Sequence, residues 1–99
     1  MLSGNRMAIT VKFVGALRHA AGVKTQAVVC GECSVKDLVN RISGNAPELR
    51  RDLIGGEGET ARPNALILVN GREISVLSGL DTKVKDGDEV VFVPVVHGG

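Results

Sequence analysis

The stretch Val90-Val91-Phe92-Val93-Pro94-Val95-Val96-His97-Gly98-Gly99 decides the fold of this chain. Its first seven residues are apolar, and a continuous apolar run predicts a strand that is buried inside a sheet. Gly98 and Gly99 have no Cβ atom, so they favour a thin, flexible stalk that presents the terminal carboxylate to a partner's narrow channel. A frayed chain end is the alternative interpretation of these two glycines.

Four further segments have the residue pattern of strands: residues 7–14, 24–30, 65–69 and 72–76. The first two are joined by a short segment that contains Ala20-Ala21-Gly22, which suits a turn or a single helical turn ended by glycine, so we expect an antiparallel hairpin. Asn70-Gly71 predicts a second hairpin, because both central residues of a type I′ turn need positive φ. Residues 85–88 predict the turn that precedes the terminal strand.

One amphipathic helix is expected between the second and third strands. Ser34 is a favourable N-cap, and Asp37 lies three positions on, near the positive end of the helix dipole. The apolar residues that follow share one helical face: Val35, Leu38, Val39 and Ile42. Residues 47–53 predict a short second turn or helix with proline near its start. Residues 54–63 predict a mobile surface loop whose glycines lack the context of a phosphate-binding loop.

The predicted order is strand, strand, helix, strand, strand, terminal strand. This is the order of the ubiquitin-like β-grasp fold, an α+β fold with a mixed sheet of about five strands and one main helix packed across it. The terminal strand is expected at the centre, parallel to the first, because the helix supplies the crossover that a parallel pair requires. We expect a disordered extension over residues 1–6, the domain over 7–96 and a flexible tail over 97–99.

The composition excludes several classes of function. The 99 residues are 43% hydrophobic, which suffices for one compact core without metal or disulfide support. The 12 basic and 11 acidic residues nearly balance, and the two aromatic residues offer almost no surface for stacking bases, so we expect no direct nucleic-acid binding. No apolar segment reaches the roughly 20 residues of a membrane span, and residues 1–6 lack a signal-peptide core, so we expect a cytoplasmic protein.

Cys30 and Cys33 form a C-x-x-C pair close to the predicted helix start. A structural zinc site needs four ligands, and the only histidines, His19 and His97, lack a helical ligand spacing, so we expect no metal. A redox-active pair is a second interpretation, since a helix N-terminus lowers the pKa of a thiol. Two reduced cysteines that fill space between a strand and a helix are the third.

The chain has more apolar residues than one helix can cover. The segments 65–69 and 90–93 are apolar at positions that face both sides of a sheet. We therefore expect an exposed apolar patch of the kind that marks a protein interface, with an ordinary hydrophobic surface as the alternative. The candidate partner-binding residues are Leu66, Leu68, Phe92 and Pro94.

Several short motifs follow one another in a characteristic order: Val11-Lys12-Phe13-Val14, Leu17-Arg18, Ala21-Gly22, Leu68-Val69-Asn70-Gly71, Asp86-Gly87-Asp88-Glu89-Val90, and Pro94 ahead of Gly98-Gly99. In this order they resemble the ubiquitin-like sulfur carriers, above all the small subunit of molybdopterin synthase (MoaD) and ThiS-like proteins. The stretch from Arg62-Pro63 to Gly99 is also similar to the ubiquitin-related modifier and to small archaeal modifier proteins. Val95 is a departure, because molybdopterin synthase subunits often carry a second proline there.

The resemblance implies chemistry performed on this protein by a partner, so we do not expect an enzyme. A ubiquitin-activating-like adenylating enzyme would use ATP and Mg²⁺ to activate Gly99, while the chain itself would bind no cofactor. A sulfur donor would then convert Gly99 to a thiocarboxylate, with His97 and Gly98 as tail-recognition residues.

The sulfur acceptor that the resemblance implies is the large subunit of molybdopterin synthase or a tRNA thiolation enzyme. A ubiquitin-like modifier joined through Gly99 to lysines of target proteins by an isopeptide bond is the alternative. A β-grasp interaction domain whose Gly-Gly end is accidental is a third interpretation.

Overall fold

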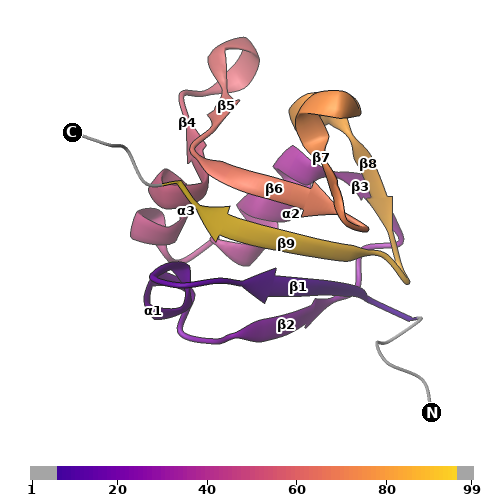
Figure 1. Cartoon of the computed structure of the whole chain (residues 1–99), viewed down its shortest axis with the longest axis horizontal. Coiled ribbons are helices and arrows are strands. Elements are labelled where there is room, and N and C mark those ends of the chain that lie inside the picture. The colour runs from indigo at the N-terminus through magenta and orange to yellow at the C-terminus, as the bar shows by residue number, and fades with distance from the viewer. Residues whose placement is uncertain (1–6, 96–99) are drawn as a thin grey trace.

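The computed structural model describes residues 7–95 of the chain. Its main sheet has five strands in the order β2-β1-β9-β6-β7 (Figure 1). Their bounds are Thr25–Val28 (β2), Ile9–Phe13 (β1), Glu89–Pro94 (β9), Ala65–Val69 (β6) and Arg72–Glu73 (β7). The terminal strand β9 is central, parallel to β1 and antiparallel to β6, which confirms the placement predicted from its apolar run.

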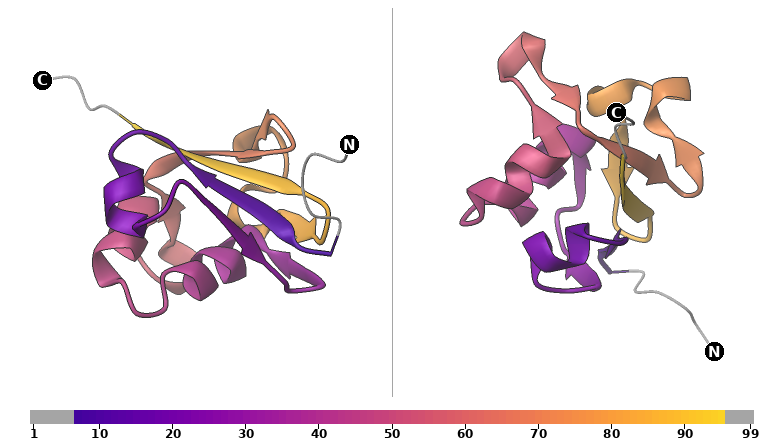
Figure 2. Two further views of the ribbon diagram at one scale, coloured as in Figure 1. Left: turned by 90° about the horizontal axis from the view of Figure 1, so that it is seen from below. Right: turned by 60° about the vertical axis from the view of Figure 1, so that its left-hand side comes forward.

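Three helices accompany the sheet: α1 (Leu17–Ala21), α2 (Val35–Ile42) and α3 (Pro47–Leu53). They lie on one side of it, with α1 beside α3 at the end of the sheet where β9 finishes (Figure 2). The Ser34 hydroxyl accepts a 3.0 Å hydrogen bond from the Asp37 N–H, so the predicted N-cap of α2 is confirmed. Pro47 stands in the first turn of α3, where its missing N–H leaves no helical bond unmade.

Short elements complete the chain. Two small antiparallel pairs join β3 (Glu32–Ser34) to β8 (Lys83–Lys85) and β4 (Ile54–Gly55) to β5 (Arg62–Pro63). Three turns of 3₁₀ helix are η1 (Gly58–Thr60), η2 (Ile74–Val76) and η3 (Gly79–Asp81).

These elements correct three predictions. The strand expected over residues 24–30 ends at Val28, and the strand expected over 72–76 gives way to η2 after Glu73. Residues 54–63, expected as a loop without structure, form the β4–β5 hairpin, and its first side chain, Ile54, is buried in the core. This hairpin was missed because a strand of two residues is too short to show an alternating pattern.

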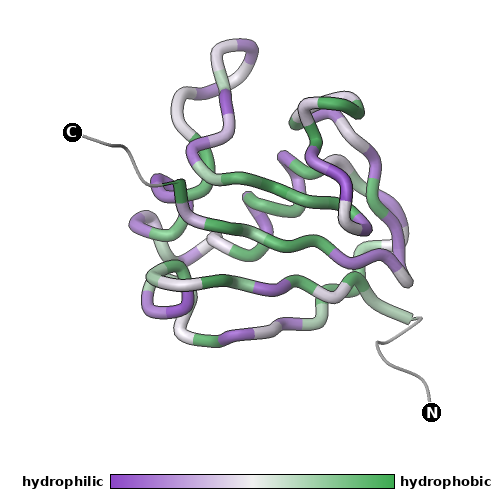
Figure 3. The backbone as a smooth tube through the Cα atoms, in the orientation of Figure 1, coloured by the Kyte–Doolittle hydropathy of each residue, from purple (hydrophilic) through white to green (hydrophobic). Residues whose placement is uncertain are grey.

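The core lies between the sheet and the helices. Phe13 of β1 and Phe92 of β9 are almost fully buried, and their rings stack with centroids 5.7 Å apart. Figure 3 shows that β6 and β9 are hydrophobic along most of their length, and these two strands supply much of the core. Aliphatic side chains surround the two rings, among them Ile9, Val11, Leu38, Val39, Leu53, Ile67 and Val90.

The Asn70-Gly71 turn has the predicted geometry, with φ of 51° and 83°. The Asn70 side chain also accepts a 2.9 Å hydrogen bond from the Glu89 N–H and donates one of 3.1 Å to Asp88. One residue therefore fixes both the β6–β7 hairpin and the start of the central strand.

Candidate functional site

The side of the sheet opposite the helices carries a group of four half-buried apolar side chains, here called the outer patch: Leu66 and Leu68 of β6, and Val91 and Val93 of β9. Leu66 pairs with Val93, and Leu68 pairs with Val91. Side chains at directly opposed positions stand close together on one face of a sheet. Because no helix among residues 7–95 covers this side, the outer patch faces outward.

Phe92 does not belong to the outer patch, and the prediction that its side chain contacts a partner is wrong. Its side chain is completely buried and stacks on Phe13. Successive side chains of a strand point to opposite faces, so Phe92 faces the helices while Val91 and Val93 face outward. Because residues 90–96 are apolar at every position, the sequence alone does not show which of their side chains face the helices and which face outward.

An ion pair lies next to the outer patch. The Nζ atom of Lys12 in β1 is 2.8 Å from a carboxylate oxygen of Glu89 in β9, with both side chains close to half exposed. Lys12 is also the register partner of Val91. Exposed pairs of this kind contribute about 0.2–1 kcal/mol to stability. A charged edge beside an apolar centre is the usual anatomy of a protein interface.

At its far end β9 runs into a hollow, here called the root hollow, of about 440 Å³. Pro94, the last residue of the strand, is half-buried, and Val95 beyond it is exposed. Gly15 lies beneath the proline, with a φ of +60°, and a Cβ atom placed there would come within 3.2 Å of the proline Cγ. The residues that line the root hollow are Ala16, Leu17, Arg51, Asp52, Asn64, Pro94 and Val95.

Asn64 fixes one wall of the root hollow. Its N–H donates to the Leu53 carbonyl and its side-chain amide donates to the Arg51 carbonyl, each over 2.9 Å. These bonds tie the end of α3 to the start of β6, where Ala65 pairs with Pro94. The exposed side chains of Arg51 and Asp52 thus stand close to the point where β9 ends.

The predicted tail residues His97, Gly98 and Gly99 lie outside the described residues. Of the predicted partner-binding residues, the structure brings Leu66 and Leu68 together in the outer patch. Pro94 lies at the end of β9, and by the same alternation it faces the helix side, over Gly15 and the root hollow. Arg51, Asp52 and Asn64 were missed. They join this region only through the packing of α3, for which the sequence around them holds no local signal.

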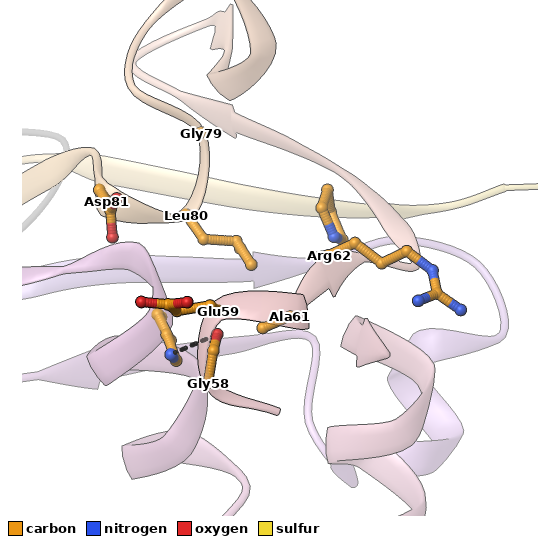
Figure 4. Close-up of a pocket in the computed structure, with 9 residues that line it drawn as sticks. Gly58, Glu59, Ala61, Arg62, Gly79, Leu80 and Asp81 are labelled. Atoms are coloured by element: carbon orange, nitrogen blue, oxygen red, sulfur yellow. Dashed lines mark hydrogen bonds between the residues drawn. The ribbon is translucent and has the colours of Figure 1, made fainter. Parts of the chain in front are cut away.

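A second hollow, of about 550 Å³, lies between the β4–β5 hairpin and η3. Figure 4 shows Leu80 directed toward the segment from Gly58 to Ala61, and Arg62 extending away from it. The ammonium group of Lys36, which also lines this hollow, donates a 3.1 Å hydrogen bond to the Gly58 carbonyl. Its remaining charged lining residues are Glu59, Arg62 and Asp81, and this mixture of signs selects no particular ligand.

Cys30 and Cys33 are free thiols with their sulfurs 2.9 Å apart. Burial raises the pKa of Cys33 from 9.0 to about 12, and the hydrogen bond with Cys30 and the charge on Cys30 act in the same direction.

Within residues 7–95 no three His, Cys, Asp or Glu side chains gather closely enough to hold a metal ion. In the same part of the chain, none of the helices has the length and apolar character that crossing a membrane requires.

Comparison with known proteins identifies the family. The ThiS family model matches residues 11–99. Ubiquitin-related modifier 1 homolog 2 of Arabidopsis thaliana is 35% identical over 66 residues, which cover 67% of this chain and 66% of that relative. A putative sulfur carrier protein of Archaeoglobus fulgidus is 44% identical over 64 residues, or 63% of this chain and 66% of that protein. The chain thus spans just under two thirds of the length of these relatives.

A solved structure agrees with this assignment. The small archaeal modifier protein 1 of Methanosarcina acetivorans is similar with a TM-score of 0.76 and 32% identity, covering 97% of this chain and 100% of that one. This likeness confirms the predicted ubiquitin-like β-grasp fold. The chain therefore belongs to the ThiS family, whose members are small ubiquitin-like carrier proteins and not themselves enzymes.

Proposed function

We propose that this chain carries sulfur as a thiocarboxylate on Gly99, formed after a partner enzyme adenylates the Gly99 carboxylate. The observation that carries the proposal is the placement of β9. This strand is paired on both sides, by β1 and β6, and it leads past the outer patch and the root hollow toward Gly98-Gly99. A firmly held strand with an accessible apolar face gives a partner a fixed surface from which to reach the tail.

The proposed chemistry solves a problem of reactivity. A carboxylate is a poor electrophile, because its negative charge is shared by two oxygens. In the first step Gly99 attacks the α-phosphate of ATP, forming an acyl adenylate and releasing pyrophosphate. A sulfur nucleophile then displaces AMP. Mg²⁺ and ATP belong to the partner, and none of the described residues is needed as a general acid or base.

We further propose that the outer patch is the docking surface for the adenylating enzyme. Its four apolar side chains form the centre, and the Lys12–Glu89 pair lies at the edge. Pro94 and the root hollow follow where the strand ends, and His97 and Gly98 would enter the channel that leads to the nucleotide. A glycine at the second-last position suits a narrow channel, because any side chain there would collide with its walls.

The sulfur so carried would pass to a molybdopterin synthase large subunit or to a tRNA thiolation enzyme in the cytoplasm. A second function is favoured by the relatives that are named as modifiers. In that case a lysine amine of a target protein attacks activated Gly99 and forms an isopeptide bond. Both outcomes share the acyl adenylate, so the step after activation separates them.

Intact mass spectrometry tests the proposal. The full chain is incubated with a competent adenylating enzyme, Mg²⁺-ATP and a sulfur donor, and we expect the mass gain of one oxygen replaced by sulfur. Gly98→Ala and a variant with one residue added after Gly99 should stay unmodified while keeping the native circular dichroism spectrum. Gly99-dependent conjugates of higher mass would favour the modifier function instead.

A further inference from the structure

The turn Cys30-Gly31-Glu32-Cys33 between β2 and β3 takes no part in the proposed tail chemistry. Its two sulfurs already lie 2.9 Å apart, whereas the sulfurs of a disulfide lie about 2.05 Å apart. Both side chains are half-buried, so the pair remains open to a small molecule. Cysteines that only fill space need not face each other, and this mutual approach requires a separate explanation.

Residues 84–86, which lie beside this turn, hold the two cysteines in this arrangement. The Asp86 N–H donates to the Gly31 carbonyl over 3.0 Å, and the Asp86 carboxylate accepts a 3.4 Å bond from the Cys30 N–H. On the other side, Cys33 pairs with Val84 in the β3–β8 ladder. Gly31 adopts a φ of +70°, which side chains rarely tolerate and which turns the chain back on itself. A bond between the sulfurs would therefore form with little movement of the chain.

We propose that Cys30 and Cys33 form a reversible disulfide by exchange with a low-molecular-weight disulfide of the glutathione type. In the first step the Cys30 thiolate attacks one sulfur of that disulfide, which forms a mixed disulfide and releases one thiolate. The Cys33 thiolate then attacks the Cys30 sulfur, which closes the internal bond and releases the second thiolate. The two cysteines lose two electrons, the external disulfide gains them, and the two cysteine protons end on the released thiols.

The surroundings of Cys33 set the order of these steps. Burial raises the pKa of its thiol to about 12, so Cys33 remains protonated while Cys30 attacks first. The hydrogen bond with Cys30 and the charge on Cys30 also raise the pKa of Cys33. Both contributions end once the Cys30 sulfur is held in the mixed disulfide, which leaves burial as the main cause that still opposes ionisation of Cys33.

This pair acts apart from the tail. β3 and β8 lie beside the start of β9, whereas the chain leaves the sheet at the opposite end of that strand (Figure 1). The six residues of β9 separate the two places by about 20 Å, at about 3.3 Å for each residue. Formation of the disulfide and activation of Gly99 are therefore separate reactions, and an experiment can find one without the other.

Alkylation followed by intact mass spectrometry of the full chain tests the proposal. After incubation with oxidised glutathione, the wild type should accept no alkyl group, retain no glutathione and stay monomeric, with two hydrogens lost. Excess reduced glutathione should restore both thiols. Wild-type protein that keeps two alkylatable thiols, retains glutathione or forms a linked dimer would overturn the proposal.

Two matched variants test the order of attack, with circular dichroism as the check on folding. Cys33→Ser should retain one glutathione on Cys30. Cys30→Ser should react at least about tenfold more slowly, because the remaining thiol is the one whose pKa burial raises. Equal rates in the two variants would contradict the assignment of Cys30 as the attacking group.

Discussion

Replacing Phe92 by alanine tests which side chains of the central strand β9 face the core and which face outward. Phe92 is fully buried and stacks on Phe13, and truncation of a buried phenylalanine costs about 3–5 kcal/mol. Its neighbour Val93 is half-buried on the outer patch, so Val93→Ala should cost about 1 kcal/mol or less. A domain of this size has about 5–15 kcal/mol of stability, so Phe92→Ala should leave it barely folded, while Val93→Ala leaves it intact.

Urea unfolding followed by circular dichroism measures the difference, because the chain has no Trp or Tyr for fluorescence. With a slope near 1.5 kcal/mol/M, the midpoint should fall by about 2.5 M for Phe92→Ala and by about 0.6 M for Val93→Ala. The midpoint of Phe92→Leu, which keeps most of the apolar volume, should lie between the midpoints of these two variants. Equal losses of stability in Phe92→Ala and Val93→Ala, or a larger loss in Val93→Ala, would refute the conclusion that Phe92 faces the core and Val93 faces outward.

Three further predictions concern the interface, the helix cap and the pH dependence of stability. Leu68→Asp should raise the KM for the adenylating enzyme at least about tenfold without unfolding the chain, and Val76→Asp, an exposed position outside the outer patch, should not; equal KM values in steady-state kinetics would remove the outer patch as a docking surface. Ser34→Ala removes the hydroxyl that caps α2 and should cost about 1 kcal/mol in thermal unfolding, whereas an unchanged midpoint would show that the cap contributes nothing. The pKa of Cys33 is raised in the fold to about 12, so the unfolded chain loses this proton first and stability should fall as pH rises from 9 toward 12; the same titration of Cys33→Ser should fall less, and identical curves would contradict the shift.

Local signals predicted the parts of the fold that depend on a few neighbouring residues. The cap at Ser34 and the turn at Asn70-Gly71 each rest on one side chain or on positive φ, and both were confirmed. The central place of β9 followed from its apolar run. The β3–β8 pair left no such signal, because Lys83-Val84-Lys85 buries only Val84.

The candidate site could be predicted only in part for a related reason. Leu66 and Leu68 were identified by the apolar surplus of β6, but a strand that is apolar on both faces does not show which residues face outward. Pairing with β1 and β6 fixes that choice, and it places Phe92 inside. The root hollow depends on α1, α3 and β9 meeting in space, so no stretch of sequence holds its pattern. The chemistry assigned to Gly99 rests on family resemblance and remains a prediction.

The most direct test of the proposed function is the intact mass of the chain after reaction with its adenylating enzyme, Mg²⁺-ATP and a sulfur donor. We predict the gain of one sulfur in place of one oxygen, located on Gly99 by fragmentation and absent from the variant with an added terminal residue. An unchanged mass with an enzyme shown to be competent on another carrier, or the same gain in the extended variant, would contradict it.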